Sequence, residues 1–232
     1  MGPLAKLYAC CMNQELESRA LCHAWRAPTQ AGFRRYYRLE DLIVPVDYLL
    51  ARAQTRGTPL ALCLVDLEKA FDTVPHQRLL DILSNTYGVD ACMLETIRRV
   101  LVDTWGQVPG GDTPFRTTTG VKQGCPMSPL LFGLYFDRVV EYIQTHTSNL
   151  DAVKVAHLTL QAALYADDVI LCAPSPSSLQ TQLTCLADFA GAEHLRVSKE
   201  KTLVLLENCK RKVHLDAIEM QEVAESKYLR IF

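Results

Sequence analysis

Two adjacent carboxylates interrupt an apolar run in the stretch Leu164-Tyr165-Ala166-Asp167-Asp168-Val169-Ile170-Leu171. The residues on either side, 158–164 and 169–173, are rich in β-forming side chains and predict two short strands that meet at a tight turn. Two ionised groups this close repel each other, and burying either one without a partner is unfavourable. A bound cation would remove the conflict. Taken alone, such a pair is more often a solvated turn than a metal site.

Composition places few limits on the partner of this chain. The 232 residues are 49% hydrophobic and 22% charged, as in an ordinary globular protein of one large or two small domains. The formal net charge of −2 gives no overall basic signature, so any nucleic-acid site must be local. The nine cysteines lack the spacing of zinc ligands or of a disulfide framework. With no membrane-length apolar run and no signal-peptide pattern, we expect an intracellular, soluble protein without a membrane partner.

Apolar residues at helical spacing predict the helices, and continuous apolar runs predict further strands. The expected helices lie at residues 4–12, 39–57, from His76 towards Gly88, after Asp90, at 129–143 and at 177–191. Pro45 is expected to kink or split the second of these. A strand at 60–65 ends on Asp66, and a closing strand is expected at 202–206.

Three features then follow one another along the chain: Asp66 at a strand end, a Gln-Gly-x-Pro-x-Ser-Pro turn at 123–129, and the Asp pair of the hairpin. Separated carboxylates at strand ends suit Mg²⁺, which takes few protein carboxylates and keeps positions for phosphate oxygens. Two such ions can activate an attacking 3′-hydroxyl and stabilise the leaving pyrophosphate in an in-line displacement. The pattern therefore indicates nucleotide polymerisation.

At these residues the chain resembles the reverse transcriptases of non-LTR (LINE-type) retrotransposons and, more distantly, those of group II introns. The matching runs, in the family's order, are Gln30–Arg34, Asp66–Asp72, Gly120–Leu131, Tyr165–Asp168 and Val197–Thr202. A lone Tyr-x-Asp-Asp is weakly specific, whereas five ordered motifs are strongly so. Three positions depart from the family's pattern: Gly133 and Ser198, where Asn is usual, and Arg230, where Gly is usual.

The resemblance implies an α+β fold: a right-hand polymerase palm, with an antiparallel sheet backed by helices, and partial fingers. The expected divisions are partial fingers at 1–60, the palm at 61–206 with an inserted fingers segment near 75–115, and the start of a palm-thumb connection at 207–232. Because segments that would complete the fingers and thumb are missing, we expect a truncated domain from a longer polyprotein with an endonuclease.

By the same resemblance, Asp66, Asp167 and Asp168 are the expected metal-binding and catalytic carboxylates, with Asp168 the less direct ligand. The expected cofactor is a pair of Mg²⁺ ions, which Mn²⁺ could replace. Lys201 matches a family lysine near the active site that protonates the leaving pyrophosphate. Its alternative is a solvated lysine at a strand edge.

The resemblance also implies residues that contact the nucleotide or the template. Phe71 matches an aromatic gate that crowds a ribose 2′-hydroxyl, and its alternative is a core phenylalanine at the start of a helix. Gln123 and Gly124 match a turn that lies against the incoming nucleotide and the template base; the alternative is a tight turn before a helix. Arg34 belongs to a local basic cluster with Arg26, Arg35 and Arg38, which either contacts a phosphate or is simply solvated.

The implied activity is RNA-directed DNA polymerisation: a nucleotidyltransferase that extends a primer 3′-hydroxyl with deoxynucleoside triphosphates. The expected partners are an RNA template and a DNA primer, and nuclear action follows from the resemblance only. One alternative is a catalytically silent remnant that binds nucleic acid weakly or serves as an interaction module. A polymerase that makes RNA is disfavoured if Phe71 acts as a gate.

Overall fold

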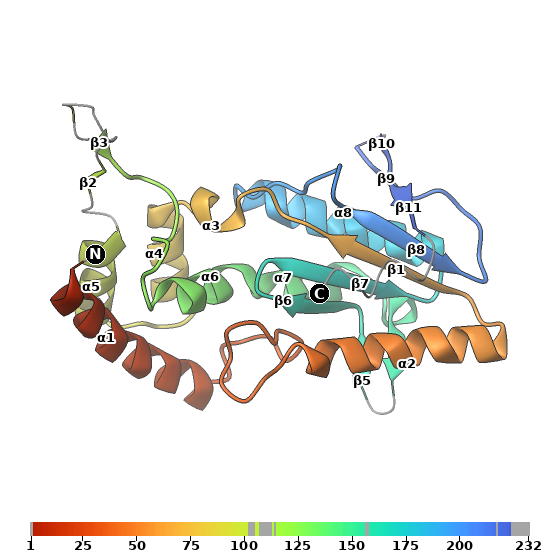
Figure 1. Cartoon of the computed structure of the whole chain (residues 1–232), viewed down its shortest axis with the longest axis horizontal. Helices are drawn as coiled ribbons and strands as arrows, with labels where there is room; N and C mark the ends of the chain where they lie inside the picture. Colours follow the sequence, from red (N-terminus) through yellow and green to blue (C-terminus); the bar gives the residue numbers. More distant parts are fainter. Residues whose placement is uncertain are drawn as a thin grey trace. The chain divides into compact units, whose positions relative to one another are not determined.

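The structure, a computed structural model, describes residues 2–101, 105–106, 113, 115–155, 158–216 and 218–223. Figure 1 shows the helices and strands of the chain in sequence colours. Internal contacts divide the chain into two units. Unit 1 comprises Met1–Arg26 and Lys69–Phe136, and unit 2 comprises Ala27–Glu68 and Asp137–Phe232. The expected boundaries of fingers, palm and thumb stay predictions, and residues 224–232, including Arg230, lie outside the described part.

Unit 1 is mainly helical. Its elements are α1 (Pro3–Cys22), α3 (Ala70–Thr73), α4 (His76–Asn85), α5 (Ala91–Leu101), α6 (Ser128–Phe136) and the paired strands β2 (Trp105–Gly106) and β3 (Phe115–Arg116). α4 packs against both α5 and α6. The expected helix after Asp90 is confirmed as α5. The Asp90 carboxylate caps it by accepting hydrogen bonds from the backbone N–H groups of Cys92 and Met93, each at 3.0 Å.

Gly133 in α6 makes room for the side chain of Arg26. A Cβ atom added at Gly133 would collide with the Arg26 guanidinium group. That side chain cannot simply move into solvent, because Arg26 is only 8% exposed. The departure from the asparagine that is usual in the family therefore has a packing reason within unit 1.

Unit 2 is built on a five-stranded sheet with the order β11-β8-β1-β7-β6. These strands are β1 (Leu60–Val65), β6 (Ala162–Tyr165), β7 (Asp168–Ala173), β8 (Leu203–Glu207) and β11 (Gln221–Glu222). Every neighbouring pair is antiparallel except β11 with β8. The unit also contains the hairpins β4 (Val153–Val155) to β5 (Leu158–Leu160) and β9 (His214–Leu215) to β10 (Ile218–Glu219). The predicted α+β class and the antiparallel sheet are confirmed.

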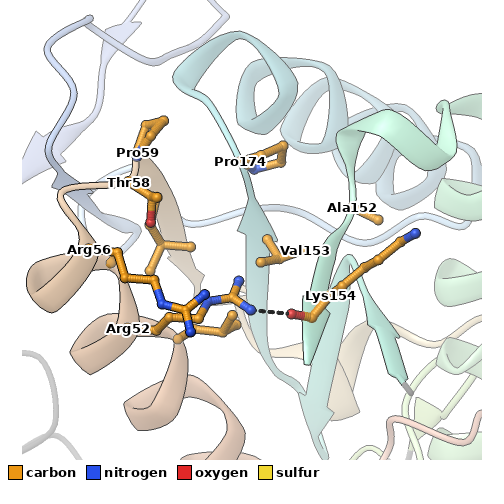
Figure 2. Close-up of a pocket in the computed structure, with 11 residues that line it drawn as sticks. Arg52, Arg56, Thr58, Pro59, Ala152, Val153, Lys154 and Pro174 are labelled. Carbon is orange, nitrogen blue, oxygen red and sulfur yellow. Dashed lines mark hydrogen bonds between the residues drawn. The ribbon is translucent and has the colours of Figure 1, made fainter. Parts of the chain in front are cut away.

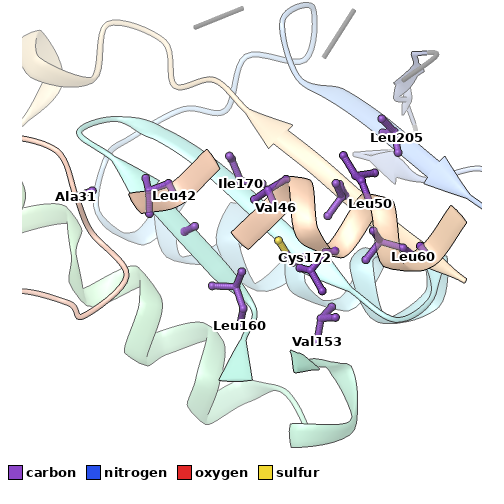
Figure 3. Close-up of a cluster of buried hydrophobic side chains, with 14 residues drawn as sticks. Ala31, Leu42, Val46, Leu50, Leu60, Val153, Leu160, Ile170, Cys172 and Leu205 are labelled. Carbon is purple, nitrogen blue, oxygen red and sulfur yellow. The ribbon is translucent and has the colours of Figure 1, made fainter. Parts of the chain in front are cut away.

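Helices cover both faces of this sheet. α2 (Glu40–Arg56) places its buried residues in one apolar cluster with alternate residues of β1, including Leu60 and Leu62 (Figure 3). α8 (Pro176–Ala192) contacts β1 and β7 on the other side and packs against α7 (Arg138–His146), which η1 (Asn149–Asp151) follows in the chain. Burial on both faces explains why residues 60–65 form a continuous apolar run.

Two expectations about helices are corrected. Of the kink or split expected at Pro45, the split does not occur, since α2 continues through Pro45 from Glu40 to Arg56. The single helix expected at 129–143 is two, because α6 ends at Phe136 and α7 begins at Arg138. The buried carboxylate of Asp137, at the junction, accepts hydrogen bonds from residues outside both helices. As far as the structure describes the helices, none combines the length and apolarity needed to cross a membrane.

Candidate active site

Asp66 follows β1 directly, and backbone hydrogen bonds fix the chain at this point. Its carbonyl oxygen accepts from the N–H of Ser198 at 2.8 Å, and the N–H of Glu68 donates to the carbonyl of Arg196 at 2.8 Å. An isolated bridge between Leu67 and Val197 lies between these two bonds. Because Ser198 contributes its backbone here, the departure from asparagine at that position does not remove the contact.

Asp167 and Asp168 lie at the tip of the β6–β7 hairpin, as predicted. Tyr165 pairs with Asp168, so that Ala166 and Asp167 form the connection between the strands. Ala166 has φ +60°, a left-handed conformation that a residue with a Cβ rarely adopts. A buried, non-glycine residue held in this region needs support from its surroundings.

The structure brings the three predicted carboxylates into one electrostatic neighbourhood in unit 2. Burial is the largest of three causes, with the nearby carboxylates of Asp167 and Asp66, that together raise the pKa of Asp168 to about 6. Burial, with a smaller contribution from Asp66, also raises the pKa of Asp167. A cation bound beside the hairpin pair would stabilise the charged forms of Asp167 and Asp168.

The donor chemistry fits a hard divalent cation. Oδ2 of Asp66 is buried and has no hydrogen-bond partner among the described residues. Ionised carboxylates only accept, so a buried carboxylate oxygen without a hydrogen-bond donor, with two further carboxylates nearby, suits an oxygen-liganded ion such as Mg²⁺. Within the described ranges, no three His, Cys, Asp or Glu side chains converge closely enough to form a ready metal cluster. The residues fit a metal chemically without forming a closed cage.

Lys201 lies beside the first of these carboxylates. Its Nζ is 3.5 Å from Oδ2 of Asp66, close enough for an ion pair but without a hydrogen bond to that oxygen. The Lys201 side chain is 72% exposed. Lys201 is therefore a solvent-exposed lysine next to Asp66, and its predicted role with the leaving pyrophosphate stays a prediction.

Gln30 supports the hairpin tip, a role that the sequence did not predict. Its side-chain Oε1 accepts from the N–H of Ala166 at 3.0 Å and from the N–H of Gly32 at 2.7 Å. Its Nε2 donates to the carbonyl of Ala166 at 3.1 Å and to Oδ1 of Asp137 at 3.0 Å. Gln30 is fully buried, so these bonds face no competition from water.

Gly32 lets the same loop approach the hairpin tip. A Cβ at Gly32 would lie 2.8 Å from Cα of Ala166 and 2.9 Å from the carbonyl carbon of Tyr165. Backbone bonds between Ala31 and Leu164 (2.8 Å) and between Leu164 and Thr29 (2.9 Å) complete the contact. The motif Gln30–Arg34 could have suggested a structural role, since glycine often marks close approach of two backbones.

Arg34 is partly committed to this loop. Its Nη1 donates to the carbonyl oxygens of Ala27 at 2.8 Å and of Gln30 at 3.0 Å. Its guanidinium carbon lies 4.0 Å from the ring centroid of Tyr37. Arg34 therefore braces the segment that carries Gln30, and the predicted contact with nucleotide or template stays a prediction.

The remaining predicted site residues belong to unit 1. Phe71 is half-buried, and its ring stacks on Phe132 with 4.3 Å between centroids. The N–H of Val121 donates to the carbonyl of Phe71 at 2.8 Å, which fixes the predicted turn beside it. Gln123 is exposed and its Nε2 lies 3.5 Å from a carboxylate oxygen of Asp72.

Gly124 has the conformation of a tight turn. Its φ is +77°, and nothing lies within 4 Å of the position that a Cβ would occupy. The turn explains the glycine by itself. Within unit 1 the structure groups Phe71, Gln123 and Gly124, while Asp66, Asp167, Asp168, Lys201 and Arg34 belong to unit 2.

Known proteins resemble this chain in sequence. Residues 5–229 match the family described as reverse transcriptase (RNA-dependent DNA polymerase). A retrovirus-related Pol polyprotein from the type-2 retrotransposable element R2DM of Drosophila melanogaster is 30% identical over 178 residues, which are 75% of this chain and 16% of that protein. A Pol polyprotein from a type-1 element R2 of Popillia japonica is 31% identical over 165 residues, or 68% of this chain and 26% of that protein. The chain thus spans about a quarter or less of these relatives.

Solved structures resemble the fold. Telomerase from Candida albicans, in complex with a fragment of telomeric RNA, matches with a TM-score of 0.59 and 14% identity over 94% of this chain and 36% of that one. Telomerase from Candida tropicalis, also with a telomeric RNA fragment, matches with a TM-score of 0.62 and 12% identity over 90% and 35%. At such low identity the likeness concerns the fold, and it agrees with the antiparallel sheet of a polymerase palm.

Proposed function

Because the chain belongs to the reverse transcriptase (RNA-dependent DNA polymerase) family, in its non-LTR retrotransposon branch, we propose that it extends a primer 3′-hydroxyl by a two-metal mechanism. The observation that carries this proposal is the grouping of Asp66, Asp167 and Asp168: burial and, to a smaller extent, the neighbouring carboxylates raise the pKa values of the hairpin pair. Reverse transcriptases in general use divalent metals. The finer proposal is that this chain binds two Mg²⁺ ions and is catalytically competent.

The carboxylates would hold the metal ions. Asp66 offers a buried oxygen without a hydrogen-bond partner in the described chain, and Asp167 lies in the hairpin connection. Asp168 is the first residue of β7, so we assign it the less direct contact. When bound, the two ions, Mg²⁺ or in its place Mn²⁺, activate the attacking 3′-hydroxyl and stabilise the leaving pyrophosphate.

Residues of the chain would orient the reactants. Gln30 fixes the hairpin tip, since phosphoryl transfer depends largely on positioning. Lys201 would donate a proton to the leaving pyrophosphate, and its exposed ammonium 3.5 Å from Asp66 supports this role. Phe71 would crowd a 2′-hydroxyl, and its stacking on Phe132 holds the ring in one orientation.

The proposed partners are an RNA template, a DNA primer and deoxynucleoside triphosphates. We assign Gln123 and Gly124 to the nucleotide and template base, and Arg34 to the same nucleic-acid side. Since the chain spans only part of relatives that are themselves Pol polyproteins, we propose that it works within a longer polyprotein. An endonuclease domain in that polyprotein and action in the nucleus belong to this proposal through the resemblance alone.

Primer extension tests the proposal. The purified wild-type chain is incubated with Mg²⁺, the four deoxynucleotides and a primed RNA template. The double variant Asp167→Ala with Asp168→Ala, the hairpin variant, is assayed in parallel. A matched control, Asp47→Ala with Asp188→Ala, removes two exposed carboxylates from helices of the same unit. Extension by wild type and control but not by the hairpin variant supports the proposal.

Direct metal binding provides a second readout. Mn²⁺ binding, followed by electron paramagnetic resonance, should be lost in the hairpin variant and kept in the control. Unchanged binding in the hairpin variant would sink the proposed metal site. A folded wild type that binds metal but does not extend would favour the silent remnant.

A further inference from the structure

A cavity of about 340 Å³ lies in unit 2, where α2 ends and β1 begins (Figure 2). Its lining comes from the last two turns of α2, from the connection that includes Thr58, and from residues 152–154 before and in β4. Leu60 and Val153 supply apolar surface. Arg52, Arg56 and Lys154 supply positive charge, and no acidic side chain lines the cavity within the described residues.

The two arginines concentrate like charge without visible compensation. Arg52 and Arg56 stand four residues apart on α2, a spacing that brings side chains together on one helix face and makes like charges repel. Residues 48–56 contain no Asp or Glu. Among the described residues, neither arginine forms an ion pair. Two guanidinium groups kept together in this way suit an anionic ligand.

Arg52 is held in place for such a ligand. Its Nη1 donates to the backbone carbonyl of Lys154 at 2.8 Å, and its guanidinium carbon lies 5.9 Å from the ring centroid of Tyr48. Figure 2 shows both arginine side chains reaching toward the cavity, while the ammonium group of Lys154 points away from them. A planar guanidinium oriented by one hydrogen bond keeps other N–H groups for phosphate oxygens.

This cavity is separate from the carboxylates. Leu60 begins β1 at the cavity, and Val65 ends the strand next to Asp66. At about 3.3 Å per residue, the strand puts roughly 17–20 Å between the two places. A ligand that spans both must be extended, as a nucleic-acid strand is.

We propose that Arg52 and Arg56 form a phosphate-binding subsite for a phosphodiester group of a nucleic-acid strand, remote from the reacting end. The subsite rests on the proposed function in that nucleic acid is the ligand. The guanidinium groups neutralise one or two backbone phosphates. Such contacts fix a strand without reading its sequence.

The salt dependence of RNA binding tests the subsite without catalysis. A fluorescein-labelled single-stranded RNA is titrated by anisotropy at several KCl concentrations, in EDTA and without nucleotides. In Arg52→Gln with Arg56→Gln, the slope of log K against log salt should become shallower by about 0.7 to 1.4, as expected for the loss of one or two phosphate contacts. The control Arg98→Gln with Arg99→Gln removes the same charge from arginines that Glu95 already pairs, and its slope should stay that of wild type.

Each other outcome overturns the subsite. If wild type binds RNA and extends primers but the salt slope is unchanged in the Arg52, Arg56 variant, the subsite is rejected and the proposed function stands. A second measurement is the thermal midpoint with inorganic phosphate or ATP added. If either one raises the midpoint of wild type but not of this variant, while the salt slope of RNA binding is unchanged, the cavity binds small phosphates instead. Wild type that neither binds RNA nor extends primers overturns the proposed function as well.

Discussion

The side-chain amide of Gln30 holds both backbone groups of Ala166, accepting from its N–H at 3.0 Å and donating to its carbonyl at 3.1 Å. Ala166 directly precedes the two hairpin carboxylates and has a left-handed backbone conformation. The direction of the amide is itself set, because its nitrogen also donates to Asp137. A residue far away in sequence thus determines the geometry at the tip of the hairpin.

Replacing Gln30 should loosen this tip. Gln30→Ala removes a hydrogen-bond donor from the buried Asp137 carboxylate and the side-chain partner of both backbone groups of Ala166, so we expect a loss of about 2–4 kcal/mol in unfolding free energy. We also expect primer extension to fall by more than this loss of stability alone would cause. Urea denaturation measures the first effect. The neighbouring Thr29→Ala is the control: the Thr29 hydroxyl is buried and without a partner in the described chain, so its removal should be near neutral. Equal losses in both variants would contradict the argument.

Gly32 should tolerate no side chain. In Gly32→Ala the new Cβ meets the backbone of Ala166, which cannot give way easily, and we expect a destabilisation of about 2 kcal/mol or more. Gly191→Ala, in α8 with nothing within 4 Å of its Cβ position, should be neutral or slightly stabilising. Thermal midpoints of the two variants decide the matter, and a Gly32→Ala midpoint equal to that of wild type speaks against the close approach.

Neutralising Asp168 should stabilise the metal-free chain at neutral pH. Its pKa is raised from 3.8 to about 6, so the folded state holds this proton more tightly and loses stability as pH rises from about 4 to about 6. Asp168→Asn removes that loss. After discounting for its half exposure, we expect a gain on the order of 1 kcal/mol above pH 6 and none near pH 4.

Urea denaturation in EDTA across this pH range measures the difference between Asp168→Asn and wild type. The exposed Asp188→Asn should leave the pH profile unchanged. Adding Mg²⁺ at neutral pH should stabilise wild type more than Asp168→Asn. A variant less stable than wild type in EDTA at neutral pH would refute the assigned repulsion.

Gly133 and Arg26 should be energetically coupled. Gly133→Ala improves helix propensity by about 1 kcal/mol, yet its Cβ displaces the buried Arg26 guanidinium, so we expect a net loss of about 1–2 kcal/mol. With Arg26→Met already present, the same change at Gly133 should cost less. A double-mutant cycle by urea denaturation measures the coupling. Strict additivity of the two changes would exclude the proposed packing.

Phe71 should control the choice of sugar if it acts as a gate. Phe71→Ala should raise the use of ribonucleotides relative to deoxynucleotides by about tenfold or more, because the ring no longer crowds a 2′-hydroxyl. Single-nucleotide extension with each substrate measures the ratio. Phe132→Leu is the control, since this fully buried ring stacks on Phe71: its change should lower stability and leave the ratio within a few-fold. An unchanged ratio in Phe71→Ala returns the residue to a packing role.

The sequence predicted those elements whose pattern is local. The apolar run of β1, the β6–β7 hairpin and α8 were found because each carries its own periodicity and its own ends. The resemblance selected the carboxylates, and the structure brought all three into unit 2. These predictions need only the order of residues along the chain.

What the sequence did not predict depends on contacts between distant segments. Gln30 was part of a quoted motif, but its function depends on Ala166, which only the folded chain brings near. The helix expected at 129–143 is interrupted at Asp137, although the apolar residues on either side continue the helical pattern. The Asp137 carboxylate accepts hydrogen bonds from Ala27 and Gln30, which are distant in sequence. Periodicity cannot reveal where a buried carboxylate finds its partners.

The central place of β1 in the sheet governs how this chain must fold during synthesis. Ala61 pairs with Ala173 and Leu60 with Glu207, so both partner strands leave the ribosome long after β1. At about 5–20 residues per second, its apolar run waits on the order of ten seconds before both edges can be covered. Such non-local pairing folds slowly and leaves the strand open to aggregation meanwhile. The yield of native chain should therefore rise with the supply of chaperones that hold nascent polypeptides.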